Sequence, residues 1–187
     1  MTLKEFIKQF RQYSKDEEKP YLFSKEDIEQ CIAEAMKWYS KKNPILRESS
    51  IDTIPKQKTY PLPADYQTWY EGLESVDIAG SHIVIENPCY GRITFLYYAN
   101  RRLCEVAKED LQFFFEYCFG ALLEKEVLES VKEENKTGTL KAMKLGRGLD
   151  LTFDESKNIR QELLLLAREK KQKFFDNIKG NRKGIWI

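Results

Sequence analysis

The sequence is short of the residues from which metal sites and catalytic centres are built. Histidine occurs once, as His82, and no two cysteines form a Cys-x-x-Cys pair. The four cysteines are Cys31, Cys89, Cys104 and Cys118. A zinc cluster needs four closely spaced nitrogen or sulfur ligands, so we expect no metal site. No nucleophile–base pair and no phosphate-binding glycine motif is visible, so we also expect no cofactor and no catalysis.

Long hydrophobic runs are also missing. No apolar stretch approaches the roughly 20 residues of a membrane helix, and residues 1–10 lack the apolar core of a signal peptide. The 31 basic and 30 acidic residues leave a net charge of +1, which gives no overall attraction to nucleic acid or to an anionic membrane. We therefore expect no membrane contact and reduced thiols in a cytoplasm. This balance still allows a local basic patch.

What the sequence does contain is enough apolar surface for a sizeable core, since 42% of its 187 residues are hydrophobic. Apolar residues recur at helical spacing in four segments, residues 2–13, 24–42, 108–134 and 155–178. Ser24 stands where an N-cap is needed, and Asn43-Pro44 is a stop signal for the second helix. The third segment is the most apolar, and we expect it to form the centre of the core.

The only strongly β-like part of the chain lies between residues 60 and 98. Its runs 83–86 and 92–98 are rich in β-branched and aromatic residues. We expect these two runs to pair as an antiparallel hairpin. Residues 76–78 are a candidate third strand.

Irregular chain is expected around this β-like part. Residues 43–59 are polar, and a turn at residues 64–66 follows the extended segment that Pro61 and Pro63 impose. Together the patterns predict an α+β fold that is mostly helical. Several helices would surround the long central helix, with a small antiparallel sheet or hairpin.

Three parts of the chain are expected to differ in role. Residues 1–20 are interpreted as an N-terminal helical arm, because a charged stretch ending at Pro20 separates them from the second helical segment. Residues 21–179 form the main domain, and residues 180–187 form a basic tail with an apolar tip. Within the main domain, the glycine-containing connection 135–154 has a length that is typical of a functional or a mobile loop.

Several motifs of the main domain resemble one protein family, the head-to-tail adaptor proteins of tailed bacteriophages, also called head-completion or connector proteins. Tyr-x-Leu-Pro-x-Asp-Tyr (residues 60–66) is followed by a short β segment (83–88) and by Ile-Thr-Phe-Leu-Tyr-Tyr-Ala (93–99). A helix that opens with Lys-Glu-Asp comes next, after residue 107. The piece 137–151 then resembles the family's connection before the last helix.

This resemblance implies a structural role and no chemistry. Members of the family form a ring, usually of twelve subunits, beneath the portal protein. The ring extends the DNA channel and docks the stopper or tail proteins. For this chain the resemblance implies an adaptor domain over residues 21–179 and a place in the virion, at the head-to-tail interface, after synthesis in the host cytoplasm. The N-terminal helix and the Ile-Trp-Ile tip are not family motifs.

Two groups of residues are candidates for contacts outside the chain. Ile185, Trp186 and Ile187 form an apolar tip that we interpret as a partner-binding anchor, with the portal as the expected partner. The alternative is a tail that folds onto its own domain or stays disordered. Lys141, Lys144 and Arg147 are candidates for facing DNA in the channel, and the alternative is a solvated loop.

A second functional class stays open on the sequence alone. The basic residues of the tail suit a cytoplasmic helical regulatory module that binds nucleic acid or a partner protein. Salt distinguishes the two classes. Nucleic-acid binding weakens steeply between about 50 and 200 mM salt, whereas docking through apolar anchors responds mildly.

Overall fold

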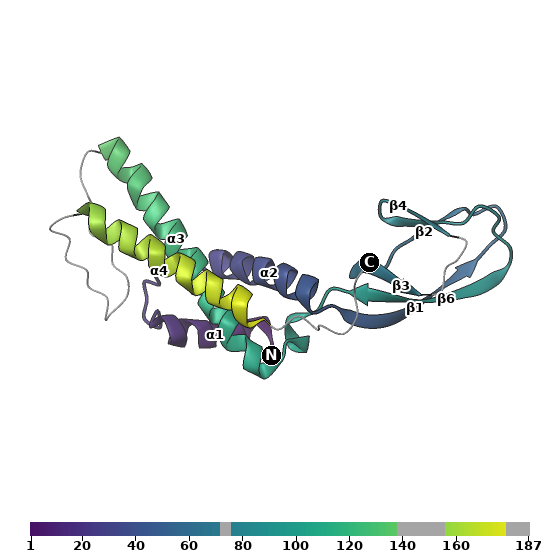
Figure 1. Ribbon diagram of the computed structural model, residues 1–187, viewed down its shortest axis with the longest axis horizontal. Coiled ribbons are helices and arrows are strands. Elements are labelled where there is room, and N and C mark those ends of the chain that lie inside the picture. Colours follow the sequence, from purple (N-terminus) through teal and green to yellow (C-terminus); the bar gives the residue numbers. More distant parts are fainter. Residues whose placement is uncertain (72–75, 138–155, 179–187) are drawn as a thin grey trace. The chain divides into compact units, whose positions relative to one another are not determined.

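A computed structural model describes residues 1–71, 76–137 and 156–178 (Figure 1). Over these ranges the chain forms four α-helices and two small antiparallel sheets, which confirms the predicted α+β, mostly helical fold. The chain divides into two compact units. Residues 1–38 together with residues from 102 onward make a helical unit, and residues 39–101 make a β unit inserted into it.

The four helices lie where the apolar spacing places them. They are α1 (Leu3–Ser14), α2 (Lys25–Lys42), α3 (Leu111–Thr137) and α4 (Ser156–Asn177). The Ser24 hydroxyl accepts a hydrogen bond from the Asp27 backbone N–H at 3.0 Å, so the predicted cap of α2 is present. Two short 3-10 turns, η1 (Leu103–Glu105) and η2 (Lys108–Asp110), lead into α3.

Helix α1 packs against α3, which differs from the separate arm expected for residues 1–20. Phe6 and Phe10 are both fully buried. The Phe6 ring lies 4.8 Å from the Phe115 ring, and the Phe10 ring lies 6.5 Å from the same ring. Burying an aromatic side chain contributes several kcal/mol at most sites, roughly 3 to 5 by truncation to alanine. This helix therefore belongs to the core of the helical unit.

A buried carboxylate fixes the chain between α1 and α2. Asp16 pairs with Arg11 at 2.5 Å and accepts hydrogen bonds from the backbone N–H groups of Leu22 and Phe23 at 2.6 and 3.2 Å. Arg11 in turn lies over the Tyr21 ring, 3.7 Å from its centroid. The charged stretch that ends at Pro20 is therefore held by specific polar contacts.

The centre of the helical unit is the seam between α3 and α4. Phe114 and Phe174 are both fully buried, and their rings meet edge to face at 5.4 Å. Gly120 lets the two helices approach closely, because a Cβ atom there would lie 2.5 Å from the Ala167 carbonyl oxygen. The prediction that the third helix forms the centre of the core is confirmed for this unit.

The β unit contains two three-stranded antiparallel sheets. In the first sheet the order is β1 (Ile45–Thr53), β6 (Gly91–Ala99) and β3 (Tyr66–Glu71). In the second sheet the order is β2 (Thr59–Pro61), β5 (His82–Val84) and β4 (Asp77–Ala79). The predicted third strand is confirmed as β4. The predicted hairpin is wrong, because β5 pairs with β2 and β4 while β6 pairs with β1 and β3.

Two segments expected to be irregular are strands instead. Residues 45–53, part of the polar stretch 43–59, form β1 and pair with β6 over nine residues. Tyr66, expected in a turn, opens β3. Both strands lie at the edges of the first sheet, where one side of the backbone has no neighbouring strand and polar side chains are common.

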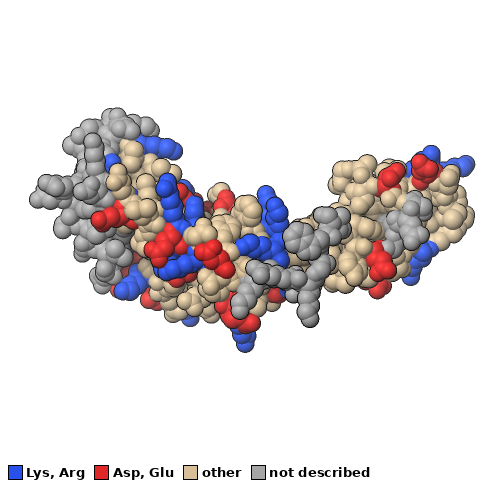
Figure 2. All heavy atoms as spheres, in the orientation of Figure 1, with Lys and Arg blue, Asp and Glu red and all other residues tan. Residues whose placement is uncertain are grey.

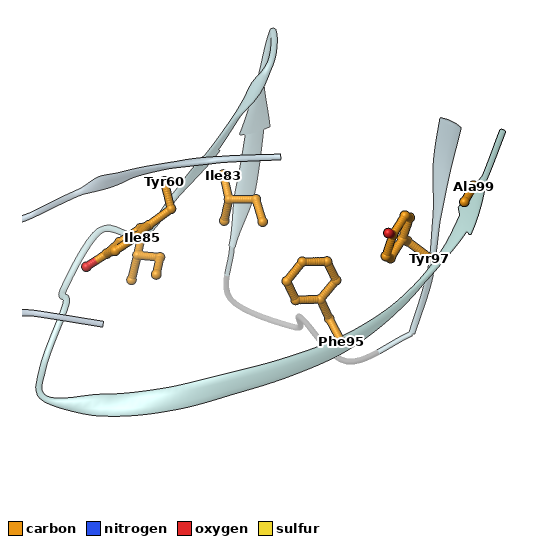
Figure 3. Packing of buried hydrophobic residues seen from close by; sticks show 6 residues of the cluster. All are labelled: Tyr60, Ile83, Ile85, Phe95, Tyr97 and Ala99. Carbon is orange, nitrogen blue, oxygen red and sulfur yellow. The ribbon is translucent and has the colours of Figure 1, made fainter. Parts of the chain in front are cut away.

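The core of the β unit lies between the two sheets (Figure 3). Tyr60, Ile83 and Ile85 come from the second sheet and its edge, and Phe95, Tyr97 and Ala99 come from alternate positions of β6. Because side chains alternate along a strand, the intervening residues of β6 must point to the opposite face of the first sheet. The first sheet therefore has a second, outer face that this core does not cover.

Candidate partner-binding surfaces

The residues that the sequence singled out for outside contacts lie in two segments of the chain beyond the described ranges. Ile185, Trp186 and Ile187 lie outside the described residues, and so do Lys141, Lys144 and Arg147. The candidate surfaces on the described part of the chain consist of other residues, which the sequence did not single out.

The first candidate surface lies on the outer face of the first sheet. We call it the outer patch, and it consists of Leu46, Tyr70, Leu96 and Tyr98. Leu46 is 45% exposed and Tyr70 is 50% exposed. Leu46 lies opposite Tyr98 in the β1–β6 pairing, and the Tyr70 and Tyr98 rings meet edge to face at 5.3 Å. Apolar and aromatic side chains in this number on one sheet face are typical of an interaction site.

Acidic side chains border the outer patch. Glu48 on β1 and Glu71 on β3 both lie opposite Leu96, so the three residues form one row across the sheet. Both glutamates are exposed. Further along the same face, Asp52 accepts two hydrogen bonds from Arg92 at 2.7 and 3.2 Å. The patch therefore offers an aromatic row next to an acidic row.

A second candidate surface lies on α4. Residues 163–166 are four consecutive leucines, and successive helix positions differ by about 100°, so the run extends most of the way around the helix. Leu163 faces the core and is 4% exposed, whereas Leu165 is 61% exposed. Leu128 on α3 is 50% exposed. Leu164 and Leu166 are partly buried against the same core as Leu163, so Leu165 is the member of the run that stays on the surface. We call this exposed part of α4 the leucine surface, and a large apolar side chain exposed there suits contact with another molecule.

The cleft between α2, α3 and α4 holds a cluster of ionisable groups. Its volume is about 280 Å³. Burial raises the pKa of the Cys31 thiol to about 12, and burial also raises the pKa of Tyr117 to about 12. Two of the carboxylates are paired with lysines, Asp27 with Lys125 at 2.6 Å and Glu124 with Lys171 at 2.5 Å, and a third, Glu34, accepts a hydrogen bond from the Tyr117 hydroxyl at 3.4 Å. A protonated thiol and paired carboxylates hold helices together and offer no activated nucleophile.

Other kinds of site have little support in the described residues. No helix in the described ranges is long and apolar enough to cross a membrane. Among residues 1–71, 76–137 and 156–178, no three His, Cys, Asp or Glu side chains are grouped to hold a metal ion. On the face of the helical unit seen in Figure 2, basic and acidic side chains are interspersed. That mixture does not mark a nucleic-acid surface on this face.

The outer patch was missed because two of its three strands, β1 and β3, were missed. The signal available was the alternation within residues 92–98, in which Leu96 and Tyr98 fall on the face opposite Phe95 and Tyr97. Reading that alternation as two faces requires knowing that one face is covered by a second sheet. No protein-family model matches this chain, and a search of curated proteins gives no match either.

Proposed function

We propose that this protein is a structural subunit of a virion, a head-to-tail adaptor that forms a ring beneath the portal. The observation that carries the proposal is that both units expose apolar surfaces, the outer patch on the β unit and the leucine surface on α4. A ring subunit needs two different contact surfaces, because each subunit binds its neighbours head to tail.

The residues that carry the family resemblance meet at one point of the β unit, which supports the proposal. Asp65 of the Leu-Pro-x-Asp motif accepts a hydrogen bond from the Tyr97 hydroxyl at 2.9 Å. The same carboxylate pairs with Arg47 at 2.6 Å. Tyr97 belongs to the Tyr-Tyr pair of the second motif. The two motifs thus form one structural contact, as expected of motifs that define a fold and not a reaction.

The proposed subunit has no cofactor and no catalytic role. Its partners are further copies of itself, the portal protein, and the stopper or tail proteins. Twelve subunits would surround the DNA channel, with Lys141, Lys144 and Arg147 as the candidates for passing contact with DNA. Strong phosphate binding would hinder sliding DNA, so these contacts must be few or exchange rapidly.

Electron microscopy of the purified full-length protein tests the proposal, alone and mixed with the portal protein encoded by the same genome. We expect rings, or an added layer beneath the portal. Leu165→Asp should prevent that assembly, because it places a charge on the exposed leucine surface. The matched control is Gln161→Asp, a charge added at an exposed polar position of the same helix. A protein that stays monomeric and ignores the portal would contradict the adaptor role.

Deleting residues 185–187 is expected to weaken docking to the partner at least tenfold, because an aromatic anchor typically contributes about 2 kcal/mol or more. The melting temperature should change little. Binding is measured by sedimentation, and unfolding by circular dichroism on the same samples. A large fall in melting temperature would show instead that the tail belongs to the core of the domain. Steep loss of binding between about 50 and 200 mM salt would favour a nucleic-acid partner.

A further inference from the structure

We infer that the outer patch of one subunit binds the C-terminal tail, residues 179–187, of a second copy of this chain. The inference rests on the proposed ring in one respect, since it names the contact that joins neighbouring subunits. It also differs from the portal docking that the resemblance implied for Ile185, Trp186 and Ile187. Three features of the chain support it: the chemistry of the patch, the order of residues in the tail, and the tail's reach.

The patch needs an occupant that is aromatic or aliphatic at one end and basic at the other. Leu46, Tyr70 and Tyr98 supply an apolar row, and the neighbouring row carries Glu48 and Glu71. Neither glutamate forms an ion pair with another described residue. An apolar ligand alone would leave these two carboxylates beside the contact without a counter-charge.

The tail has this composition in the required order. Three basic residues, Lys179, Arg182 and Lys183, precede the apolar tip of Ile185, Trp186 and Ile187. Lys183 and Ile185 are two residues apart, which corresponds to about 6.7 Å in an extended chain. Leu96 and Tyr98, which mark the acidic and apolar rows, are also two residues apart on one strand face. An extended tail therefore places its charge and its apolar tip over the matching rows.

The tail also has the length of a separate binding segment. Ile178 is 3% exposed and anchored at the end of α4, and nine residues follow it. Nine extended residues span at most about 30 Å. A tail that leaves one subunit and binds a different surface on the next is a heterologous contact, and such contacts close into a ring when the rotation between subunits allows it.

Disulfide trapping in the full-length protein tests the contact. The exposed cysteines are first removed by Cys89→Ser and Cys104→Ser, leaving only buried thiols among the described residues. Trp186→Cys is then combined with Leu46→Cys. The matched control combines Trp186→Cys with Ser50→Cys, because Ser50 lies four residues along the same strand face, about 13 Å from Leu46. A disulfide requires Cα atoms within about 7 Å, so the two positions are distinguishable.

After mild oxidation we expect a ladder of linked oligomers from the Leu46 pair and at least fivefold less from the Ser50 pair. Equal cross-linking of both pairs would overturn the inference, as would a disulfide formed only within single chains. A charge exchange gives a second readout that needs no oxidation. Glu48→Lys with Glu71→Lys should weaken self-association roughly tenfold, and adding Arg182→Glu with Lys183→Glu should restore it. Failure of the second exchange to restore association would exclude direct contact.

The outcome also separates this inference from the proposed function. Rings that form beneath the portal regardless of tail or patch substitutions would overturn the tail contact and leave the adaptor role standing. Tail-to-patch cross-links between chains, with no layer added to the portal, would leave the contact standing and contradict the adaptor role.

Discussion

At the scale of single residues, Asp65 connects two strands of the β unit, β1 and β6, and no sequence pattern indicated this role. Its carboxylate binds Arg47 of β1 and Tyr97 of β6, and its backbone carbonyl accepts a hydrogen bond from the Asn100 N–H at 2.7 Å. The family resemblance drew attention to this aspartate, but only the structure explains why the position needs a carboxylate. Two donors from two strands converge on it, and an amide offers only one acceptor oxygen.

Replacing Asp65 tests this explanation. Asp65→Ala should lower the free energy of unfolding by about 2 to 3 kcal/mol, because it removes the carboxylate that accepts from both the Tyr97 hydroxyl and the Arg47 guanidinium. Tyr97→Phe removes one neutral donor and should cost about 1 kcal/mol. Urea denaturation followed by near-ultraviolet circular dichroism measures both. A larger effect from Tyr97→Phe than from Asp65→Ala would show that the packing of the Tyr97 side chain, and not the Asp65 carboxylate, stabilises this part of the β unit.

At the scale of elements, the helix α1 shows how far apolar spacing can be trusted. The spacing of Leu3, Phe6, Ile7 and Phe10 predicted the helix correctly, but carried no information about what covers its apolar face. Two of these residues are completely buried, whereas Leu3 is 42% exposed. Replacing a buried residue of α1 should therefore lower the free energy of unfolding more than replacing the exposed Leu3, and single substitutions can measure this difference.

We expect Phe6→Ala to destabilise the protein by about 3 to 4 kcal/mol, through lost burial and the cavity it leaves beside Phe115. The matched control Leu3→Ala lies on the same helix and should change stability by no more than about 1 kcal/mol. Equilibrium denaturation in guanidinium chloride distinguishes these values. Equal and small effects would mean that α1 detaches in solution.

Elements whose structure is determined by neighbouring residues could be predicted from the sequence, whereas elements that depend on distant partners could not. Helices follow from their own spacing and caps, as the Ser24 cap shows. The strand β1 escaped prediction because Arg47 and Ser49 occupy inward positions where a sheet usually has apolar residues. Its partner β6 lies about forty residues further along the chain, so no short window of sequence contains the pairing. The outer patch depends on that pairing and was missed with it.

The seam between α2 and α3 should make stability sensitive to alkaline pH. Burial raises the pKa of Cys31 from 9.0 to about 12 and raises the pKa of Cys118 well above 9.0. In the unfolded chain both thiols lose their protons near pH 9, whereas the folded protein keeps them. The unfolded state therefore binds fewer protons, and the free energy of unfolding falls as pH rises from about 9 toward 12.

The slope should approach about 1.4 kcal/mol per pH unit for each fully buried thiol. Urea denaturation under reducing conditions between pH 8 and about 10.5 measures it. Cys31→Ala should make the decline shallower, whereas Cys104→Ala, which removes an exposed thiol, should leave it unchanged. An identical slope in the Cys31→Ala variant would show that Cys31 ionises freely in the folded state.

At the scale of the whole molecule, the chain is two cores in one polypeptide. The helical unit is discontinuous in sequence, and the β unit is a continuous stretch of residues 39–101 placed between α2 and α3. A domain of about 60 residues buries a smaller fraction of its surface on folding than a larger domain does, and it is correspondingly marginal in stability by itself. The helical unit and the β unit can therefore differ in their free energies of unfolding.

Hydrogen exchange followed by mass spectrometry can measure this independence. Asp65→Ala should speed amide exchange in β1, β3 and β6 by at least tenfold while leaving exchange in α3 and α4 nearly unchanged. Phe6→Ala should give the opposite pattern. If either substitution accelerates exchange equally throughout, the chain unfolds as one cooperative unit.

The packing of α1 on α3 also has a consequence for synthesis on the ribosome. Phe6 emerges before Phe114 and Phe115, whose rings it contacts, because those two residues lie more than a hundred positions later in the chain. At roughly 5 to 20 residues per second, the apolar face of α1 waits about 5 to 20 seconds for its partner. During that interval the nascent chain is a ready client for a ribosome-associated chaperone, and the inserted β unit lengthens the wait by its own 63 residues.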